Sequence, residues 1–508
     1  MKRLSARPAV LFMAWLALVA SVVTAQADSG IFFGNSHLFI RSAQQGFNDW
    51  HNSYPWSMAE LNGDLYVGTG RVEVTSSIMT FTGGMMGGSL PPLHDDTPPL
   101  LSDFLAFTPT GIVVTDAAKY EAWRQGSRAE IWRLRWGRWQ RVYQARFVPS
   151  LLRAADGTYP YEAAEIMGFR AMTAFREKDG TRALYAALGG FSFAVSPPLI
   201  LRSTDGKNWM PVATPPAMGR ETRALGVHSG RLYVGVGGQS VAGPSVPAAV
   251  WSSDDPSNPA SWTKVLDLAA ADPTNTNVLS IASFNGRVYA GTENATGFQV
   301  WRSTVEDPIG SADWTRIVTG GAGASGNAWA GTMLPFKGHL YVGSMSVPGL
   351  TGSPTAFKGF DLIRIGIDDK WDLVIGDPRA GILPLSGQAS GFGNPFHLYC
   401  WSLVPYRGRL YLGTFDAATF MRLAKESGAP MPAPPGMTQA QFDAILSKAG
   451  GGLYWSADGV QWNEVMQNGF GDWYNYGLRN MIVHRGVLWV GLSNPFYGLE
   501  VWAGVAYQ

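Results

Sequence analysis

Short runs of alternating apolar and polar residues, separated by turn residues, occupy the chain from residue 30 onward. One run recurs in seven places: a short turn, then Leu-Tyr-Val-Gly or a close variant. A period of two predicts half-buried strands, and Asn-Gly or similar turns between them predict hairpins. The seven copies begin at Asn62, Asp179, Ser229, Asn285, Lys337, Arg407 and Arg485.

The fourth copy shows the whole repeat. Strands are predicted over 279–284 and 287–292, and two more over 298–303 (FQVWRS) and 314–318 (WTRIV). Each unit is therefore a four-stranded antiparallel meander, and seven such units predict an all-β, seven-bladed β-propeller. The last copy ends after its third strand, so we expect the N-terminal segment SHLFIRS, residues 36–42, to close that blade.

On these repeats the chain resembles exported bacterial propeller proteins with LYVGT and EVWRS repeats, within the sialidase-like and Kelch-like propeller superfamily. The turns STDGKNW from Ser203 and SADGVQW from Ser456 resemble Asp-box turns, one residue shorter than the usual form. The resemblance covers nearly the whole mature chain and implies the fold rather than a chemistry. In such turns we expect Asp205 and Asp458 to bond local backbone amides.

Residues 1–27 read as a signal peptide, because basic residues precede a short apolar stretch and Ala25-Gln26-Ala27 offers a cleavage site. We therefore expect a periplasmic or secreted, monomeric protein with one propeller domain over 28–508. Lys and Arg number 39 and Asp and Glu 38, without a basic tract, which disfavours nucleic acid and a membrane surface as partners. The single cysteine, Cys400, lies in an apolar run and is expected to be buried.

Two long insertions interrupt the repeat, at about 69–128 in the first copy and 414–451 in the sixth. Loops of this length in a compact fold are usually functional or disordered. Helices are predicted over 116–124, 417–426 and 439–448, the last with a capping box from Thr438 to Gln441. The first insertion is expected to form a lid over the channel mouth, with an unstructured surface loop as the alternative.

Polar residues recur at one register before the first strand of several repeats. The positions are Asp49, Asp272, Asn394 and Asp472, and then Asn52, Asn275, Asn327, His397 and Asn475. In one interpretation these side chains cap their own turns, which repetition in five blades favours. In the other they bind a polar ligand or a hard cation; calcium is the cofactor that oxygen ligands suggest, although no calcium-loop spacing is present.

Departures from the repeat are the stronger functional signal. Aromatic and imidazole side chains gather in copies one, six and seven and are expected to be exposed at the mouth: Trp50, His51, Tyr54, Phe396, His397, Trp473 and Tyr474. Such side chains suit a sugar or another flat amphipathic ligand. A third column holds Arg170, Arg223 and Arg479, which either clamp a carboxylate or sulfate or bridge adjacent blades.

Two functions remain open. The first is a binding or interaction protein that recognises a polar or anionic ligand, such as a glycan, on its loop-rich face. Its predicted ligand-binding residues are Asp49, Trp50, Asn52, Arg170, Arg223, His397, Asp472, Trp473, Tyr474, Asn475 and Arg479. The alternative is a polysaccharide lyase or glycoside hydrolase, with His51 or Tyr54 as acid/base and the arginines neutralising a carboxylate. No nucleophile elbow, zinc or phosphate-loop motif is present in the sequence.

Overall fold

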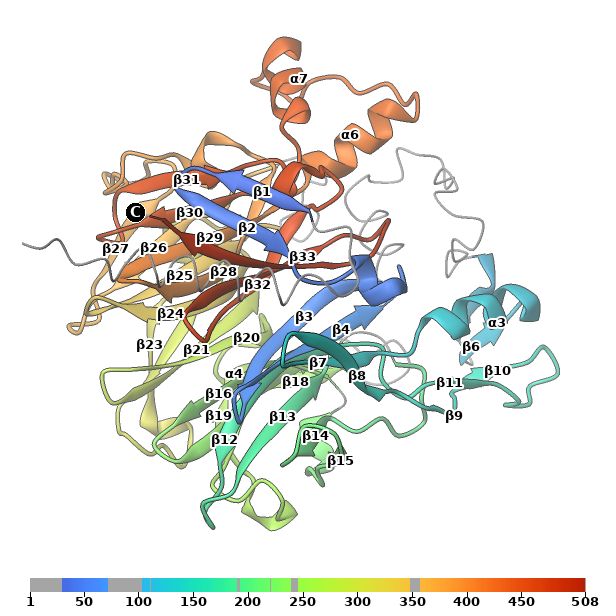
Figure 1. The fold of residues 1–508 in the computed structure, drawn as a ribbon. Coiled ribbons are helices and arrows are strands. Elements are labelled where there is room, and N and C mark those ends of the chain that lie inside the picture. The colour runs from blue at the N-terminus through green and yellow to red at the C-terminus, as the bar shows by residue number, and fades with distance from the viewer. Residues whose placement is uncertain are drawn as a thin grey trace, which may run out of the picture.

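The computed structural model describes residues 30–71, 103–109, 111–189, 192–219, 221–238, 245–347 and 357–507. The protein is mostly antiparallel β-structure with few helices (Figure 1). The repeated segments fold as four-stranded antiparallel meanders, each named here after its first strand. The predicted signal peptide lies outside the described residues, and within them no helix has the length and apolar character needed to cross a bilayer.

Three meanders form separate sheets. The β3 meander comprises β3 (Asn52–Leu61), β4 (Asp64–Arg71), β7 (Glu130–Arg135) and β8 (Arg138–Gln144). The β12 meander comprises β12 (Phe169–Arg176), β13 (Arg182–Leu188), β14 (Ile200–Ser203) and β15 (Met210–Pro211). The β16 meander comprises β16 (Thr222–His228), β17 (Arg231–Gly238), β18 (Val246–Ser253) and β19 (Thr263–Asp267).

The next meanders are joined into one larger sheet by single pairs between neighbours. The β20 meander comprises β20 (Asn275–Phe284), β21 (Arg287–Asn294), β22 (Val300–Ser303) and β23 (Trp314–Val318). The β24 meander comprises β24 (Trp329–Phe336), β25 (His339–Met345), β26 (Leu362–Ile365) and β27 (Trp371–Ile375). The β28 meander comprises β28 (His397–Tyr406), β29 (Arg409–Asp416), β30 (Leu453–Ser456) and β31 (Trp462–Met466).

The β32 meander joins the two ends of the chain. It comprises β32 (Gly477–His484), β33 (Val487–Ser493), β34 (Glu500–Ala506) and, from the N-terminus, β2 (His37–Arg41). β2 pairs antiparallel with β34, His37 opposite Ala506, and β1 (Ile31–Gly34) pairs with the outer edge of β2. The predicted pairing of segment 36–42 with the last repeat is confirmed.

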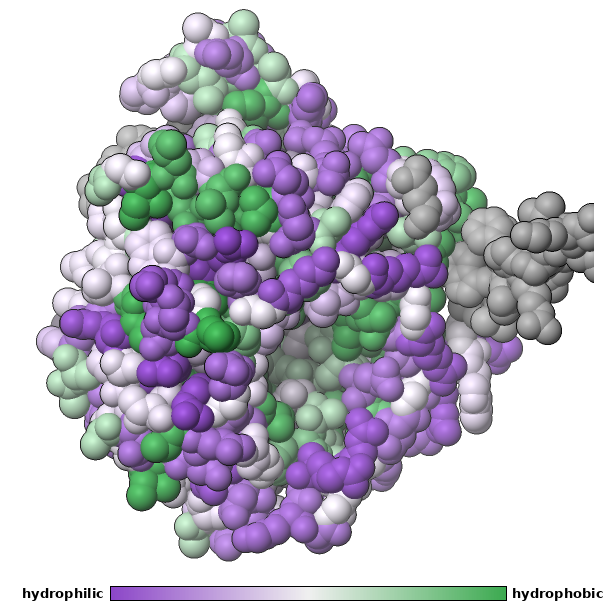
Figure 2. Space-filling model, turned by 90° about the vertical axis from the view of Figure 1, so that its left-hand side faces the viewer, coloured by the Kyte–Doolittle hydropathy of each residue, from purple (hydrophilic) through white to green (hydrophobic). Residues whose placement is uncertain are grey.

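The first strands of the meanders contact one another in sequence. β3 contacts β12, β12 contacts β16, and the contacts continue through β20, β24 and β28 to β32. β32 in turn contacts β3, so the circuit of contacts returns to its start. Figure 2 shows the face on the left of Figure 1, which is hollowed near its centre with apolar side chains inside the hollow.

The repeated residues have identifiable packing roles. A Cβ on Gly68 would lie 2.7 Å from the Cβ of Phe169, and one on Gly413 would lie 2.6 Å from the Cβ of Leu478. The glycine of Leu-Tyr-Val-Gly therefore lets the first strand of the next meander approach closely. In the EVWRS segments, the indole N–H of Trp502 donates to Glu500 at 2.8 Å. Trp132 and Trp301 donate in the same way to Glu130 and Gln299.

The Asp-box-like turns hold their own backbone, as the sequence predicts. The Asp205 carboxylate accepts from the amides of Lys207 and Asn208, each at 2.8 Å. Asp458 accepts from Val460 and Gln461 at the same distances. Both aspartates are therefore turn residues, and the buried Cys400 is likewise part of the core, as predicted.

The insertions carry short elements outside the meanders. The first holds β5 (Leu105–Thr108), β6 (Gly111–Val114) and α3 (Ala117–Gly126), beside β9 (Phe147–Pro149), β10 (Leu152–Arg153) and β11 (Glu162–Ala164). The second holds α6 (Ala418–Glu426) and α7 (Gln439–Ser447), with the predicted Thr438 capping box (Figure 1). Short helical turns α4 (Leu268–Ala271) and α5 (Gly320–Gly323) precede β20 and β24. The three predicted helices are confirmed, whereas most of the predicted lid, residues 72–102, lies outside the described residues.

Candidate functional site

The recurring asparagines form a repeated internal tie, called here the polar column: Asn52, Asn275, Asn327, Asn475 and, in the same register, His397. Asn475 is fully buried, and its Nδ2 donates to the Gly469 carbonyl and to Glu500, both at 2.9 Å. Its Oδ1 accepts from Asn494 Nδ2 at 3.0 Å. Asn52, Asn275 and Asn327 repeat this pattern with Glu130, Gln299 and Asp361 on the third strand. The contacts favour the structural interpretation of these positions, because the same bonds tie the turn to the sheet in each case.

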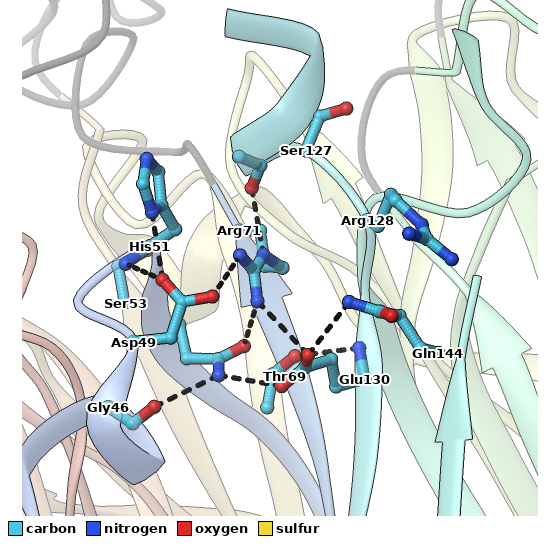
Figure 3. A network of polar contacts seen from close by, with 12 residues as sticks. Gly46, Asp49, His51, Ser53, Thr69, Arg71, Ser127, Arg128, Glu130 and Gln144 are labelled. Atoms are coloured by element: carbon cyan, nitrogen blue, oxygen red, sulfur yellow. Dashed lines mark hydrogen bonds and ion pairs between the residues drawn. The ribbon is translucent and has the colours of Figure 1, made fainter. Parts of the chain in front are cut away.

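The β3 meander has the most charged version of this tie (Figure 3). Arg71 donates to Asn52 Oδ1 at 3.0 Å and to Asp49 Oδ2 at 2.5 Å. Asp49 also accepts from His51 Nδ1 at 2.8 Å, and the His51 ring packs on Gly126 at the end of α3. The side chains of Arg71 and Glu130 are almost completely buried, so the network fixes His51 and Asp49 to the scaffold.

Asp49 and Asp472 occupy the same register but ionise differently. Burial by itself would raise the pKa of Asp49, but hydrogen bonding to His51 and the charge of Arg71 outweigh it, and the pKa lies well below its usual range. Burial raises the pKa of Asp472 to about 6, helped by the charge of Glu500. Asn494 stands where Arg71 stands in the β3 meander, so Asp472 has an amide rather than a guanidinium as its partner, at 3.2 Å.

The expected exposure is wrong for Tyr54, Phe396 and His397, all of which are buried. His397 Nδ1 contacts the Gly391 carbonyl at 3.0 Å, and its Nε2 lies 4.0 Å from Asp416. Burial lowers the pKa of His397 to about 4 and raises that of Asp416 to about 7. In the β28 meander, Gly452 stands where the other meanders of the polar column have Glu130, Gln299, Asp361 or Glu500 on the third strand. The acidic residue nearest His397 is therefore Asp416, at the end of the second strand. The ligand-binding role of His397 stays a prediction, which its burial does not favour.

Trp50, Trp473 and Tyr474 are partly exposed, as predicted. The Trp473 and Tyr474 rings stack with centroids 3.9 Å apart, and the Arg422 guanidinium of α6 lies 4.5 Å above the Trp473 ring. The Trp50 ring stacks on His51 at 4.1 Å. Among the described residues, no group of three His, Cys, Asp or Glu side chains could hold a metal ion, and calcium binding stays a prediction.

A second repeated feature is a β-bulge in the first strand of every meander. The pairing of first and second strands shifts by one residue at the same point, and each shift leaves one residue unpaired. These residues, called here the bulge set, are Trp56, Arg170, Arg223, Leu279, Gly331, Trp401 and Arg479. Bulges re-aim side chains and are frequent beside functional sites.

The three arginines of the bulge set come close to one another although they stand on β12, β16 and β32. Burial and the charges of Arg170 and Arg223 lower the pKa of Arg479 to about 10. The Arg170 guanidinium lies 4.4 Å above the Trp56 ring, and that of Arg479 lies 5.4 Å above Trp401. Arg223 lies 5.4 Å above Trp329 on β24, which is not the neighbouring meander. The first strands therefore direct these arginines into a shared central space.

Aromatic side chains continue around this space from β24 through β28 to β3. The ring of Tyr399 lies 6.0 Å from Trp329 and 5.8 Å from Trp401. Tyr54 lies 6.3 Å from Trp401 and 5.6 Å from Trp56, measured between ring centroids. Burial raises the pKa of Tyr399, and the charges that act on it belong to Tyr54, Arg223, Arg170 and Glu293.

The arginines differ in their acidic partners. Glu221 Oε1 lies 3.2 Å from Arg223 Nε and 3.9 Å from Arg170 Nε. Within the described residues, Arg479 has no ion pair with a carboxylate, and its guanidinium lies above the Trp401 ring. A half-buried guanidinium with aromatic but no acidic contacts can donate paired hydrogen bonds to an oxyanion. We call Arg170, Arg223, Arg479 and the aromatic arc the arginine site.

The structure brings together the three predicted arginines and Tyr54, but not His51. In the described part of the chain, the contacts of His51 are with Asp49, Trp50 and Gly126 rather than with the arginines. The sequence interpretation missed Trp56, Trp329, Trp401, Tyr399 and Glu221. A register signal was available for two of them: Trp56 and Trp401 precede the hairpin glycine by seven positions, as do Arg223 and Arg479.

No protein-family model and no curated protein sequence matches the chain. Among solved structures, it is similar to a GH43 β-1,3-galactosidase at 13% identity, over 47% of this chain and 88% of that one, with a TM-score of 0.28. An endo-arabinase from Bacteroides thetaiotaomicron is 14% identical over 59% and 98% of the two chains, TM-score 0.29. A Mycobacterium tuberculosis puromycin-hydrolyzing peptidase is 10% identical over 89% and 61%, TM-score 0.35. We base no conclusion about activity on likenesses of this extent.

Proposed function

We propose that this protein is an exported binding protein that holds an anionic ligand, such as an acidic sugar, in its arginine site. The observation that carries the proposal is Arg479, a half-buried guanidinium that lies near two further arginines and has no acidic partner among the described residues. Like charges in a shared low-dielectric space repel one another, so an incoming carboxylate or sulfate relieves an unfavourable arrangement. The reduced repulsion between the guanidinium groups would contribute to the free energy of binding.

The proposal includes the architecture around the site. We propose that the seven meanders are the blades of one closed propeller over residues 28–508, with the first strands lining a central channel. The circuit of contacts from β3 to β32 and back supports this arrangement, as does the pairing of β2 with β34. The hollow in Figure 2 would be one mouth of the channel. Cleavage after Ala27 would release the protein into the periplasm or the medium.

The aromatic arc indicates the shape of the ligand. The rings of Trp56, Trp401, Tyr54 and Tyr399 are buried and pack against one another next to the guanidinium groups. Sites of this composition suit a ligand with a flat apolar side and a charged end. A uronic acid has both features, because its C–H face can stack on an aromatic ring while its carboxylate accepts from arginine.

A thermal-shift titration with glucuronate, galacturonate and N-acetylneuraminate tests the proposal, with glucose as the neutral control. A ligand at about 100 times its Kd stabilises the native state by about 2.7 kcal/mol. We expect an acidic sugar to raise the Tm and the R479A variant to bind it about 10–100-fold more weakly. The exposed Arg182 on β13 supplies the matched control, R182A, which should bind normally. Equal binding by R479A and R182A contradicts the proposal.

The alternative, a carbohydrate-active enzyme, draws on one further observation: Glu221 and Tyr54 both stand beside the arginines that would neutralise a substrate carboxylate. A carboxylic acid and a phenol are groups that can transfer protons to or from a glycosidic oxygen or C5 of a uronate. Purified protein incubated with acidic polysaccharides, followed by measurement of new reducing ends and unsaturated products, tests this function. If Y54F and E221Q abolish a measured activity while H51A retains it, the enzyme interpretation replaces the binding one.

A further inference from the structure

We infer that Glu221 sets the charge of the ligand, so that the arginine site takes a singly charged anion and discriminates against a doubly charged one. The inference rests on the proposed anion-binding function of the site and adds a specificity-determining residue to it. Glu221 was not among the residues that the sequence pointed to, and it follows from the positions of the arginines.

The geometry of Glu221 shows why it acts on charge. It precedes β16 by one residue, two positions before Arg223, and its side chain is 21% exposed. Its Oε1 faces both Arg223 and Arg170, at 3.2 and 3.9 Å, so one carboxylate already serves two of the three guanidinium groups. Arg479 has no such partner among the described residues, and therefore the position left for a ligand anion is beside Arg479.

A second carboxylate limits the positive charge of the site further. Glu293 on β21 acts electrostatically on Tyr399, as do Arg170 and Arg223. Glu293 pairs with Trp329 of β24 across the sheet, and the Arg223 guanidinium lies above the Trp329 ring. Among the described residues, the site thus has three guanidinium groups, the Glu221 carboxylate that pairs with two of them, and the Glu293 carboxylate near Tyr399, so a ligand with one negative charge balances these five groups. A second negative charge on the ligand would be repelled by the Glu221 carboxylate, and no further guanidinium of the site would be available to neutralise it.

Glu221 could instead serve only to position the two arginines. The E221Q variant separates the two roles, because glutamine keeps the shape and a hydrogen-bond acceptor for Arg223 but removes the negative charge. If Glu221 only positions the arginines, E221Q should weaken all anions alike. If Glu221 sets the charge, E221Q should favour doubly charged anions over singly charged ones.

Glucose 6-sulfate and glucose 6-phosphate are suitable probes, since they have nearly the same shape but differ in charge. The sulfate ester has one negative charge, whereas the phosphate ester approaches two at pH 8 and one at pH 5, because its second pKa is about 6. For the native chain at pH 8 we expect the sulfate ester to bind about tenfold more tightly, and the preference to disappear at pH 5. In E221Q the preference at pH 8 should fall at least tenfold or reverse.

The matched control is E60Q, the same change in a carboxylate on β3 that pairs with His484 and not with the arginines. It should leave the ratio of the two Kd values unchanged. An unchanged ratio in E221Q, or an equal loss of both ligands, overturns the inference while the anion-binding function stands. If the native chain and E60Q bind neither ester nor any acidic sugar, the proposed function itself fails. If E221Q does not fold, the ratio of the two Kd values is measured for the native chain at pH 8 and pH 5. A preference for the sulfate ester that persists at pH 5, or that is absent at pH 8, overturns the inference.

Discussion

The polar column and the bulge set are both repeated at a fixed register, yet they differ in how their polar groups are satisfied. In the polar column, Asn475 uses its amide nitrogen and oxygen within the protein, with Gly469, Glu500 and Asn494 as partners. In the bulge set, Arg479 has an aromatic neighbour and like charges nearby. A repeated register therefore does not by itself indicate function; the balance of donors, acceptors and charges at that register does.

The difference also separates stability from binding. Buried hydrogen bonds between two protein groups stabilise the fold, because removing one group leaves the other buried without a hydrogen-bond partner. Charges that are incompletely compensated destabilise the fold and are available to a ligand. The comparison predicts opposite effects of mutation in the two sets.

The largest effect is expected for N475A, which removes three hydrogen bonds from a fully buried position. Glu500 and Asn494 each lose a partner, and we expect the free energy of unfolding to fall by about 3 kcal/mol. Urea denaturation followed by tryptophan fluorescence measures it. The exposed Asn463 on β31 provides the control, N463A, with an expected change below about 0.5 kcal/mol. Equal losses in both variants would remove the distinction drawn for the polar column.

A smaller effect of opposite sign is expected for R479M. Methionine keeps the apolar contact with Trp401 and removes a half-buried charge that lies near two other arginines, so the protein should become about 1 kcal/mol more stable. The same substitution should abolish the response to anions in the thermal-shift titration. R182M, at an exposed position, serves as the control. A large loss of stability in R479M would show that Arg479 is a structural bridge between blades.

The smallest effect concerns pH and compares Asp472 with Asp49. The pKa of Asp472 is raised to about 6, so between pH 4 and 6 the native state holds a proton that the unfolded state has lost, and stability falls as pH rises. The D472N variant lacks that loss and should gain up to about 1 kcal/mol relative to the native chain between pH 4 and 7.

The pKa of Asp49 is lowered, so its contribution to stability is present above pH 4 and is lost as the pH falls further. D49N should therefore lose stability relative to the native chain at neutral pH and approach it below pH 4. Thermal unfolding of both variants in matched buffers from pH 3 to 8 measures the two slopes. The comparison of the two aspartates is wrong if both variants shift in the same direction with pH.

Much of the fold could be predicted because its signals are local. The hairpin turn at Asn285, the alternation around it and the tryptophan strands give the meander without reference to the rest of the chain. The helix α7 begins at the capping box of Thr438 and Gln441, which is a local signal, and α6 is predicted within the same insertion. The pairing of β2 with β34 was predictable because the last repeat lacks a strand.

The site was only partly predictable because it depends on the three-dimensional convergence of residues from different repeats. Arg170, Arg223 and Arg479 stand out as a column in the sequence, but the sequence interpretation did not include Trp56 and Trp401. Their membership in the bulge set depends on a shift in strand pairing that hydrophobicity does not report. The burial of Phe396 was not predicted either, because α6 and α7 pack against it from an insertion whose placement the sequence does not give.

The pairing of β2 with β34 has a consequence for how the chain is made. The β32 meander combines residues 37–41 with strands between residues 477 and 506, so its sheet forms only after the ribosome has synthesised residue 506. Until then the edge of β2 that pairs with β34 is unpaired, and β3 lacks its contact with β32. The β32 meander is thereby completed only after the segments of the other six meanders have been synthesised.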